Sequence, residues 1–260
     1  ASRLLIPAAM VPPPPTGLQL SRRGGWWADL AGAWVFYSVL PLPPGLTPRF
    51  ERIARFAPWI GALIGLLEAG LWHLLAPGGL LAQVALVIAF GSWISGGLHL
   101  DGAMDTADGL AAGRERCLEA MDDSRVGASG VQALLQVVLL RVAGLALLGA
   151  SAPWALLWAA VWGRLAPLVA MQAFPYLRGD TSGSAGFHRR HWSGLALALP
   201  AGPWWWLGWL GLAPALVVPW HLGCRLGGHS GDSYGASVEW TVSWTLLLLG
   251  LAWQLLGRSL

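Results

Sequence analysis

The sequence predicts an all-α integral membrane protein, a polytopic helical bundle of about six to seven spans with a re-entrant or interfacial helix near its N-terminus. Three observations lead to this fold class. Of the 260 residues, 55% are hydrophobic and 11% are charged, with a mean hydropathy of +0.56. Apolar stretches of about 20 residues, the length that crosses a bilayer, recur along the chain. Polar loops alternate with uncharged turns between these stretches.

The N-terminal part of the chain precedes the first clear span. Residues 1–24 include the proline run Pro12 to Pro15, which predicts a mobile, Pro-rich tail. The apolar stretch 26–42 contains Asp29 and is marginal for a span that needs about 20 residues, so it predicts the re-entrant or interfacial helix. We expect residues 25–260 to form a single membrane-embedded domain.

The apolar stretches that follow are assigned by length and by the loops that bound them. The predicted spans are 57–75, 80–100, 131–150, 153–174, 193–212 and 236–256. The stretch 213–224 is shorter and predicts a half-span or a broken helix.

The arginines predict the orientation of the bundle. All sixteen basic residues are arginine, and ten of them lie in the polar loops 45–56, 101–130, 175–192 and 225–235. By the positive-inside tendency, these loops are expected on the cytoplasmic face. The net charge of +3 is too small and too dispersed to indicate nucleic-acid binding. Cys117 and Cys224 lack the spacing of a zinc site or a disulfide framework.

The stretch GGLHLDGAMDTADGL, residues 96–110, carries the strongest chemical signal. Asp101, Asp105 and Asp108 follow i, i+4, i+7 spacing, so a helix places them on one face. Like charges at this spacing repel unless a cation neutralises them, and Mg²⁺ suits a few carboxylates together with phosphate oxygens. The alternative is that these acids only solvate a helix end. His99 is a candidate base or phosphate donor, and a packing or capping role is the alternative.

Two further stretches lie on the same predicted face. In MDDSRVGASGV, residues 121–131, Ser124 and Arg125 are candidates for binding phosphate oxygens, and a helix N-cap region is the alternative. In GGHSGDSYGASVE, residues 227–239, the glycines, including Gly231, can form a backbone nest for phosphate.

Charged residues elsewhere complete the set of candidates. Asp232 and Glu239 share a helical face if their helix begins early, and Arg189 belongs to an unspecific substrate loop. Arg141 and Arg164 fall near the middle of predicted spans, where we expect them to face the bundle interior, with Glu68 as a candidate ion-pair partner.

Together these stretches resemble the cobalamin synthase family, adenosylcobinamide-GDP ribazoletransferase. The resemblance rests on the three stretches above and, more loosely, on FYSVLPLPP and RFAPWIGALIGLLEAGL, and it covers most of the chain after about residue 25. The loop 175–192 and Arg141, where lysine is expected, depart from the family pattern. The resemblance implies a Mg²⁺-dependent enzyme of the bacterial cytoplasmic membrane with its active site on the cytoplasmic face.

The resemblance also implies a reaction and roles for the candidates. Adenosylcobinamide-GDP would be joined to α-ribazole, or its 5′-phosphate, with release of GMP. Asp101, Asp105 and Asp108 would hold Mg²⁺, one of the aspartates or His99 would accept the hydroxyl proton, and Arg125 would stabilise the leaving GMP. Ser124, Gly231, Asp232, Glu239 and Arg189 would contact substrate. A homo-oligomer stays open.

Two other functions remain as alternatives. A CDP-alcohol phosphotransferase would use similar metal-diphosphate chemistry, but its D-G-x-x-A-R element is not matched here. A cation transporter would place acidic groups deep in several spans, whereas this sequence concentrates them near one face.

Overall fold

The computed structural model describes residues 25–50, 52–178 and 205–257, and every named element in these ranges is helical. The elements are α1 (Trp26–Tyr37), η2 (Ile53–Phe56), α2 (Ala57–Leu74), η3 (Ala76–Gly78), α3 (Gly79–Ile94), α4 (Leu98–Ala112), α5 (Cys117–Asp122), α6 (Ala128–Leu148), η4 (Gly149–Ser151), α7 (Ala152–Ala173), α9 (Trp205–Gly208), η5 (Trp209–Gly211), α10 (Leu212–Leu226) and α11 (Gly231–Gly257). The all-α prediction is confirmed.

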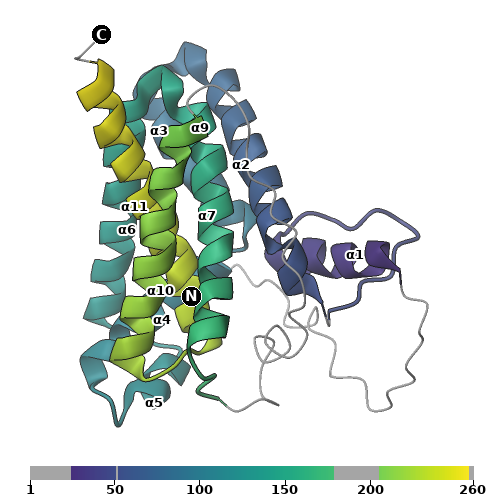
Figure 1. The fold of residues 1–260 in the computed structure, drawn as a ribbon, viewed down its shortest axis with the longest axis vertical. Helices are drawn as coiled ribbons and strands as arrows, with labels where there is room; N and C mark the ends of the chain where they lie inside the picture. Colours follow the sequence, from purple (N-terminus) through teal and green to yellow (C-terminus); the bar gives the residue numbers. More distant parts are fainter. Residues whose placement is uncertain (1–24, 51, 179–204, 258–260) are drawn as a thin grey trace.

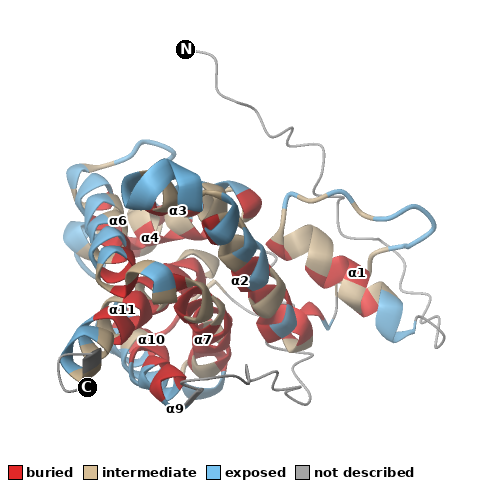
Figure 2. Ribbon diagram, turned by 90° about the horizontal axis from the view of Figure 1, so that it is seen from above, coloured by how far each residue is buried: buried red, intermediate tan, exposed pale blue. Residues whose placement is uncertain are grey.

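A bundle of long helices forms the body of the molecule, and α11 packs against α6, α7 and α4 within it (Figure 1). Five helical stretches of the described chain are long and apolar enough to cross a membrane, and one of them, Ala128–Ala173, contains both α6 and α7. Figure 2 shows the buried residues of α7 and α11 gathered in the bundle, whereas α3 has few buried residues. The polytopic bundle is therefore confirmed.

Small residues let the central helices approach closely. A Cβ added at Gly144 of α6 would lie 2.5 Å from the backbone of Leu246 in α11, and one at Gly250 would lie 2.7 Å from the carbonyl oxygen of Gly144. Close backbone contact of this kind stabilises helix pairs in lipid, where the hydrophobic effect does not drive helices together. The α6–α11 contact therefore depends on these two glycines.

Helix α1 lies crosswise to the bundle and beside it (Figure 1). Its 12 residues extend about 18 Å, which is too short for a bilayer core of about 30 Å. Tyr37 packs in a buried cluster with Phe56 and Ile94, and Arg49 Nε donates to Asp29 Oδ1 at 2.6 Å. This arrangement agrees with the predicted re-entrant or interfacial helix.

The predicted span 80–100 is broken in the structure. Helix α3 ends at Ile94, and α4 begins at Leu98, because Gly96 and Gly97 between them adopt φ values of +66° and +72°. Left-handed backbone at two successive residues interrupts the ladder of helical hydrogen bonds, and glycine adopts it without steric cost. The acids therefore lie on a separate helix and not on the continuation of a span.

The region before α11 also differs from the prediction. A helical path of 21 residues runs from Trp206 to Leu226, which is long enough to span and replaces the half-span expected at 213–224. The η5 turn continues the helical path into α10, and Pro219 is accommodated inside α10. Residues 193–204 of the predicted fifth span and the predicted tail 1–24 lie outside the described residues.

Candidate functional site

The acidic stripe occupies α4, as its spacing predicts. Asp101, Asp105 and Asp108 all lie on this helix, with Asp101 exposed and the other two half-buried. Helix α4 packs against α5, α6 and α11, and so forms part of the same end of the bundle as the beginning of α11.

Gly102 allows α4 to approach the first turn of α11. A Cβ at this position would lie 2.6 Å from the carbonyl oxygen of Asp232, which is closer than a side chain can be placed without moving backbone. Gly235 faces the backbone of His99 in a similar way. The contact brings the carboxylate of Asp232 to the same site as the stripe, although the two lie far apart in the sequence.

The carboxylates of this site act on one another electrostatically. Burial, together with the charges of Asp101, Asp232 and Asp108, raises the pKa of Asp105 to about 7. Asp101 is exposed as a residue, but partial removal of its carboxylate from water and the charge of Asp232 also raise its pKa. Removal from water is the larger cause of both shifts, and repulsion among the neighbouring carboxylates adds to it. The site therefore favours a cation.

Arg178 is a site residue that was not singled out from the polar loop 175–192. Its Nη1 donates to Asp122 Oδ1 at 2.5 Å and its Nη2 to Asp232 Oδ2 at 3.1 Å. An isolated parallel bridge positions it, in which the Leu177 amide donates to the His229 carbonyl oxygen at 2.8 Å. Its place directly after the end of a predicted span, on the face of the acidic stripe, is the signal that could have identified it.

Asp108 differs from the other two acids of the stripe. Its Oδ2 accepts from the Gly127 amide at 2.7 Å and its Oδ1 from the Gly130 amide at 2.8 Å. Both amides belong to the beginning of α6, where helical N–H groups lack partners within the helix. Asp108 therefore caps α6 from a distance in the sequence, and its metal-binding and catalytic roles stay predictions.

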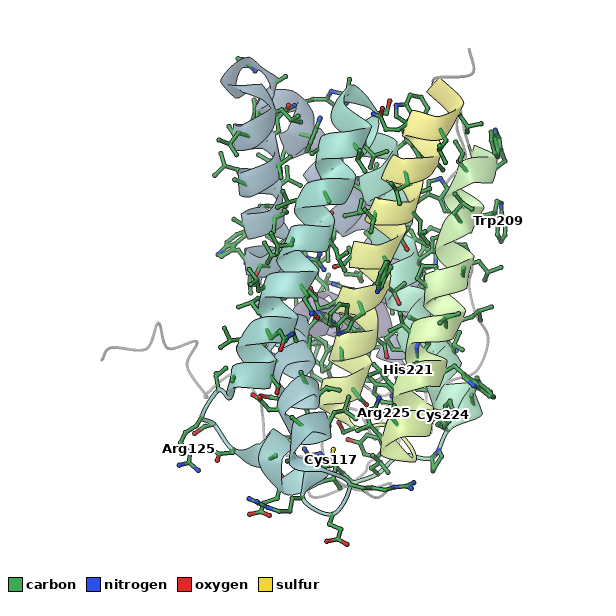
Figure 3. All side chains as sticks on the ribbon, turned by 90° about the vertical axis from the view of Figure 1, so that its left-hand side faces the viewer. Cys117, Arg125, Trp209, His221, Cys224 and Arg225 are labelled. Atoms are coloured by element: carbon green, nitrogen blue, oxygen red, sulfur yellow. The ribbon has the colours of Figure 1, made fainter. Side chains whose placement is uncertain are left out.

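The stretch 121–131 forms the end of α5, a loop and the beginning of α6. The Arg125 side chain is 88% exposed and bonds the carboxylate of Asp123, with Nη2 to Oδ2 at 2.6 Å. Figure 3 shows Arg125 projecting from the loop away from the bundle. Ser124 is exposed on the same loop. The helix N-cap alternative describes the geometry, and the substrate roles of both residues stay predictions.

The stretch 227–239 begins α11 at Gly231, so Asp232 and Glu239 do lie on one helix as the early start requires. Ser230 Oγ donates to Asp232 Oδ2 at 3.2 Å. His229 is buried, and burial lowers its pKa to about 4. Its ring nitrogens contact Ser233 Oγ and the Pro219 carbonyl oxygen, each at 3.0 Å, so this histidine connects α10 to α11.

Glu239 lies deeper in the bundle than Asp232 and forms an ion pair. Arg141 Nη2 donates to Glu239 Oε2 at 2.5 Å, and Arg141 Nε donates to Ser243 Oγ at 3.0 Å. The two charged side chains are 9% and 7% exposed. The interior position predicted for Arg141 is confirmed, but its partner in this pair is Glu239 and not Glu68. The substrate role of Glu239 stays a prediction.

Arg164 and Glu68 line the same interior region. A cavity of about 30 Å³ is bounded by these two side chains and by Arg141 and Glu239, and is large enough for a water molecule. The Arg164 guanidinium also lies 5.9 Å from the centre of the Tyr37 ring. Arg164 is buried, as its predicted position facing the bundle interior requires.

His99 is buried at the beginning of α4, next to the α11 contact. Burial lowers its pKa well below the usual range, and the positive charges of Arg164 and Arg141 lower it further, so the imidazole is neutral at pH 7. Its Nδ1 has no hydrogen-bond partner among the described residues. The catalytic role of His99 stays a prediction. Arg189 lies outside the described residues.

The donor set at this end fits Mg²⁺ bound together with a phosphate substrate. No group of three or more His, Cys, Asp or Glu side chains in the described ranges converges on one metal position. Mg²⁺ does not require such a cage, because it is usually held by one or two carboxylates, substrate phosphates and water. Asp101 and Asp105, with Asp232 facing them from α11, supply carboxylates of this kind.

Comparison with known proteins gives consistent matches. A family model described as cobalamin-5-phosphate synthase matches residues 29–250. A protein from Prochlorococcus marinus (strain MIT 9303), named adenosylcobinamide-GDP ribazoletransferase, is 59% identical over 250 residues, which cover 87% of this chain and 96% of that protein. A protein of the same name from Thermosynechococcus vestitus is 40% identical over 231 residues, covering 83% and 93%. No solved structure matches this chain.

Proposed function

The chain belongs to the cobalamin-5-phosphate synthase family, and on that premise we propose that the acidic end of its bundle is the site of its adenosylcobinamide-GDP ribazoletransferase activity. The observation that carries this proposal is the close approach of α4 to the first turn of α11, where a Cβ at Gly102 would lie 2.6 Å from the carbonyl oxygen of Asp232, so that Asp232 lies near the α4 acids Asp101 and Asp105. The substrates are adenosylcobinamide-GDP and α-ribazole, or its 5′-phosphate.

Asp101 and Asp105, with Asp232 opposite them, would hold Mg²⁺. When bound, Mg²⁺ neutralises charge on the diphosphate of the donor and so favours attack at phosphorus. A hydroxyl of the ribazole forms a bond to the phosphorus on the cobinamide side, and the bond to GMP breaks. The residues of α4 and α11 contribute by holding the diphosphate in position, because charge stabilisation and orientation supply most of the rate enhancement in phosphoryl transfer.

Two groups near the site are candidates for accepting the proton of the attacking hydroxyl. The pKa of Asp105 is raised to about 7 in the metal-free protein, which matches proton transfer near neutral pH only if Asp105 does not itself coordinate Mg²⁺, because a bound divalent cation lowers the pKa of a carboxylate. His99 is neutral at that pH, but burial and the positive charges of Arg164 and Arg141 lower its pKa and so make it a weak proton acceptor at the α4–α11 contact. A His99→Gln enzyme that retains turnover would remove the histidine from this role.

The experiment supplies purified protein in liposomes with adenosylcobinamide-GDP, α-ribazole and Mg²⁺, and measures GMP and the corrinoid product. We expect both products from the wild type and a loss of at least about 100-fold in turnover for Asp105→Asn, with membrane insertion intact, because such a loss is typical of an essential group. Glu119→Gln is the matched control, since the Glu119 side chain is 75% exposed on α5. A folded wild-type sample that forms no product would overturn the proposal.

The protein is an integral membrane protein, and we further propose that the site faces the cytoplasm. The support is that ten of the sixteen arginines fall in the polar loops 45–56, 101–130, 175–192 and 225–235, which the sequence pattern assigns to one face of the membrane. Reporter fusions after residues 77 and 115 should report opposite sides of the membrane. The same side for both would contradict the topology.

A further inference from the structure

Arg178 forms the least exposed of the ion pairs at the acidic end of the described chain. Its side chain is 25% exposed, against 72% for Arg116 and 88% for Arg125. The guanidinium joins Asp122 of α5 to Asp232 of α11, and so closes the site between two helices. Each contact is a charge-assisted hydrogen bond, which is stronger than a neutral one and gains further when it is partly removed from water.

The same guanidinium acts on the carboxylates proposed for Mg²⁺. Asp232 bonds Arg178 directly, and its negative charge contributes to the raised pKa of both Asp101 and Asp105. The positive charge of Arg178 lowers the pKa of Asp105. Arg178 therefore supplies part of the positive charge that the carboxylates require, and a divalent cation at the same carboxylates would compete with it.

Backbone hydrogen bonds hold the chain just before Arg178, and one of its two ion-pair partners lies outside the carboxylate cluster. Residue Leu177 is held by its amide bond to the His229 carbonyl oxygen, and the His229 amide donates to the Pro175 carbonyl oxygen at 2.9 Å. Asp122, whose side chain is 63% exposed, is a second anchor beyond the carboxylate cluster. The Asp122 contact lies outside the proposed metal carboxylates, so the guanidinium keeps one ion-pair partner if it leaves Asp232.

We propose that Arg178 is the internal counter-cation of the carboxylate cluster, that a divalent cation displaces it from Asp232, and that the released guanidinium then binds a phosphate oxygen of the donor diphosphate. This inference rests on the proposed function. The guanidinium is suited to both states, because its planar fork matches carboxylate and phosphate oxygens equally well. When Arg178 leaves Asp232, the carboxylate becomes available to the metal, and the guanidinium becomes available to a phosphate oxygen.

The first test measures the affinity of Mn²⁺, as a spectroscopic substitute for Mg²⁺, by electron paramagnetic resonance on the full chain without substrate. Removal of the competing charge in Arg178→Gln should tighten Mn²⁺ binding about tenfold, equivalent to about 1.4 kcal/mol, while turnover falls. Arg178→Lys keeps the charge and should bind Mn²⁺ close to wild type. Arg116→Gln removes one charge from the same region and should change neither quantity.

The outcomes of this test separate the two proposals. A folded wild type that binds no Mn²⁺ would overturn the metal site and, with it, the role of Arg178. Wild-type binding combined with equal or weaker binding in Arg178→Gln would overturn the role of Arg178 alone. A purely structural role predicts that weaker binding and lower turnover occur together, whereas displacement predicts that they change in opposite directions.

The second test needs no variant. An arginine-specific dicarbonyl reagent is applied to the wild-type protein in detergent with and without Mg²⁺, and modification of each arginine is quantified by peptide mass spectrometry. Mg²⁺ should raise the modification rate of Arg178 several-fold and leave that of Arg116 unchanged. An unchanged or reduced rate at Arg178, at Mg²⁺ concentrations that saturate the site, would show that the guanidinium is not displaced.

Discussion

Replacement of Asp108 by asparagine distinguishes two roles for this carboxylate, a structural helix cap and a metal ligand. The two oxygens of Asp108 accept from the amides of Gly127 and Gly130, at 2.7 and 2.8 Å. An asparagine side chain at this position would keep one acceptor oxygen, but its amide nitrogen would face the other backbone N–H. The change therefore removes one charge-assisted hydrogen bond at the beginning of α6 and leaves one helical donor without a partner.

The expected loss follows from these two contacts. Loss of a helix cap costs about 0.5–2 kcal/mol, and a hydrogen bond to a charged group contributes about 1.5–3 kcal/mol. We therefore expect Asp108→Asn to lower the free energy of unfolding by about 1–2 kcal/mol. For a chain of this size, that loss corresponds to a fall in Tm of about 2–8 °C.

The assay combines thermal unfolding in detergent with Mn²⁺ binding on the same samples. Asp108→Asn should lower Tm and change Mn²⁺ affinity less than about threefold, which corresponds to about 0.7 kcal/mol. Asp105→Asn should do the opposite, because it removes a proposed ligand and relieves repulsion among the acids. An Asp108→Asn protein with wild-type Tm and no Mn²⁺ binding would refute the capping argument and identify Asp108 as a ligand.

Three further predictions concern pH, the buried ion pair and helix contact. The pKa of Asp105 is raised to about 7 in the folded protein, so the native state holds a proton that the unfolded state loses near pH 4. The Tm of the metal-free protein should therefore fall as pH rises from about 4 through 7. The affinity for Mn²⁺ should rise over the same range. Constant Tm and affinity across that range would contradict the shift. Glu239→Gln should lower the free energy of unfolding by about 3–5 kcal/mol, because it leaves Arg141 buried without its carboxylate. Replacing both partners by apolar residues should cost much less. Chemical denaturation of the two variants would test this, and equal losses in both would refute it. Gly102→Ala should lower the free energy of unfolding by about 1–3 kcal/mol and reduce turnover, because its Cβ meets the α11 backbone. Gly70→Ala, whose Cβ would lie in open space, should do neither. Equal behaviour of the two variants would exclude a tight α4–α11 contact.

Local patterns in the sequence were sufficient to predict the acidic helix. The i, i+4, i+7 spacing of Asp101, Asp105 and Asp108 requires only helical geometry, which acts over a few residues. The same reasoning could not distinguish the roles of the three acids. Asp108 differs because the amides of Gly127 and Gly130 approach it, and that approach depends on how α4 packs against α6.

Contacts between distant residues account for what the sequence did not predict. Arg178 and Asp232 are 54 positions apart, and Arg141 and Glu239 are 98 apart. Several arginines lie in the polar loops, so composition gave no reason to select Arg178 from among them. Hydropathy also could not place the α3–α4 break, since glycines are common in membrane helices and only the backbone angles of Gly96 and Gly97 show that the helix ends.

Gly96 and Gly97, between α3 and α4, interrupt the helix at the point where the lipid-facing segment meets the site. Only 17% of the apolar window that includes α3 is buried inside the protein, so most of this helix is available to lipid tails. A helix in that position tilts when bilayer thickness changes, at a cost of a fraction of a kcal/mol per Å. Gly96 and Gly97 can absorb such a tilt in their backbone angles, while α4 stays fixed against α11. Such flexibility would limit how far a tilt of α3 displaces the carboxylates of α4.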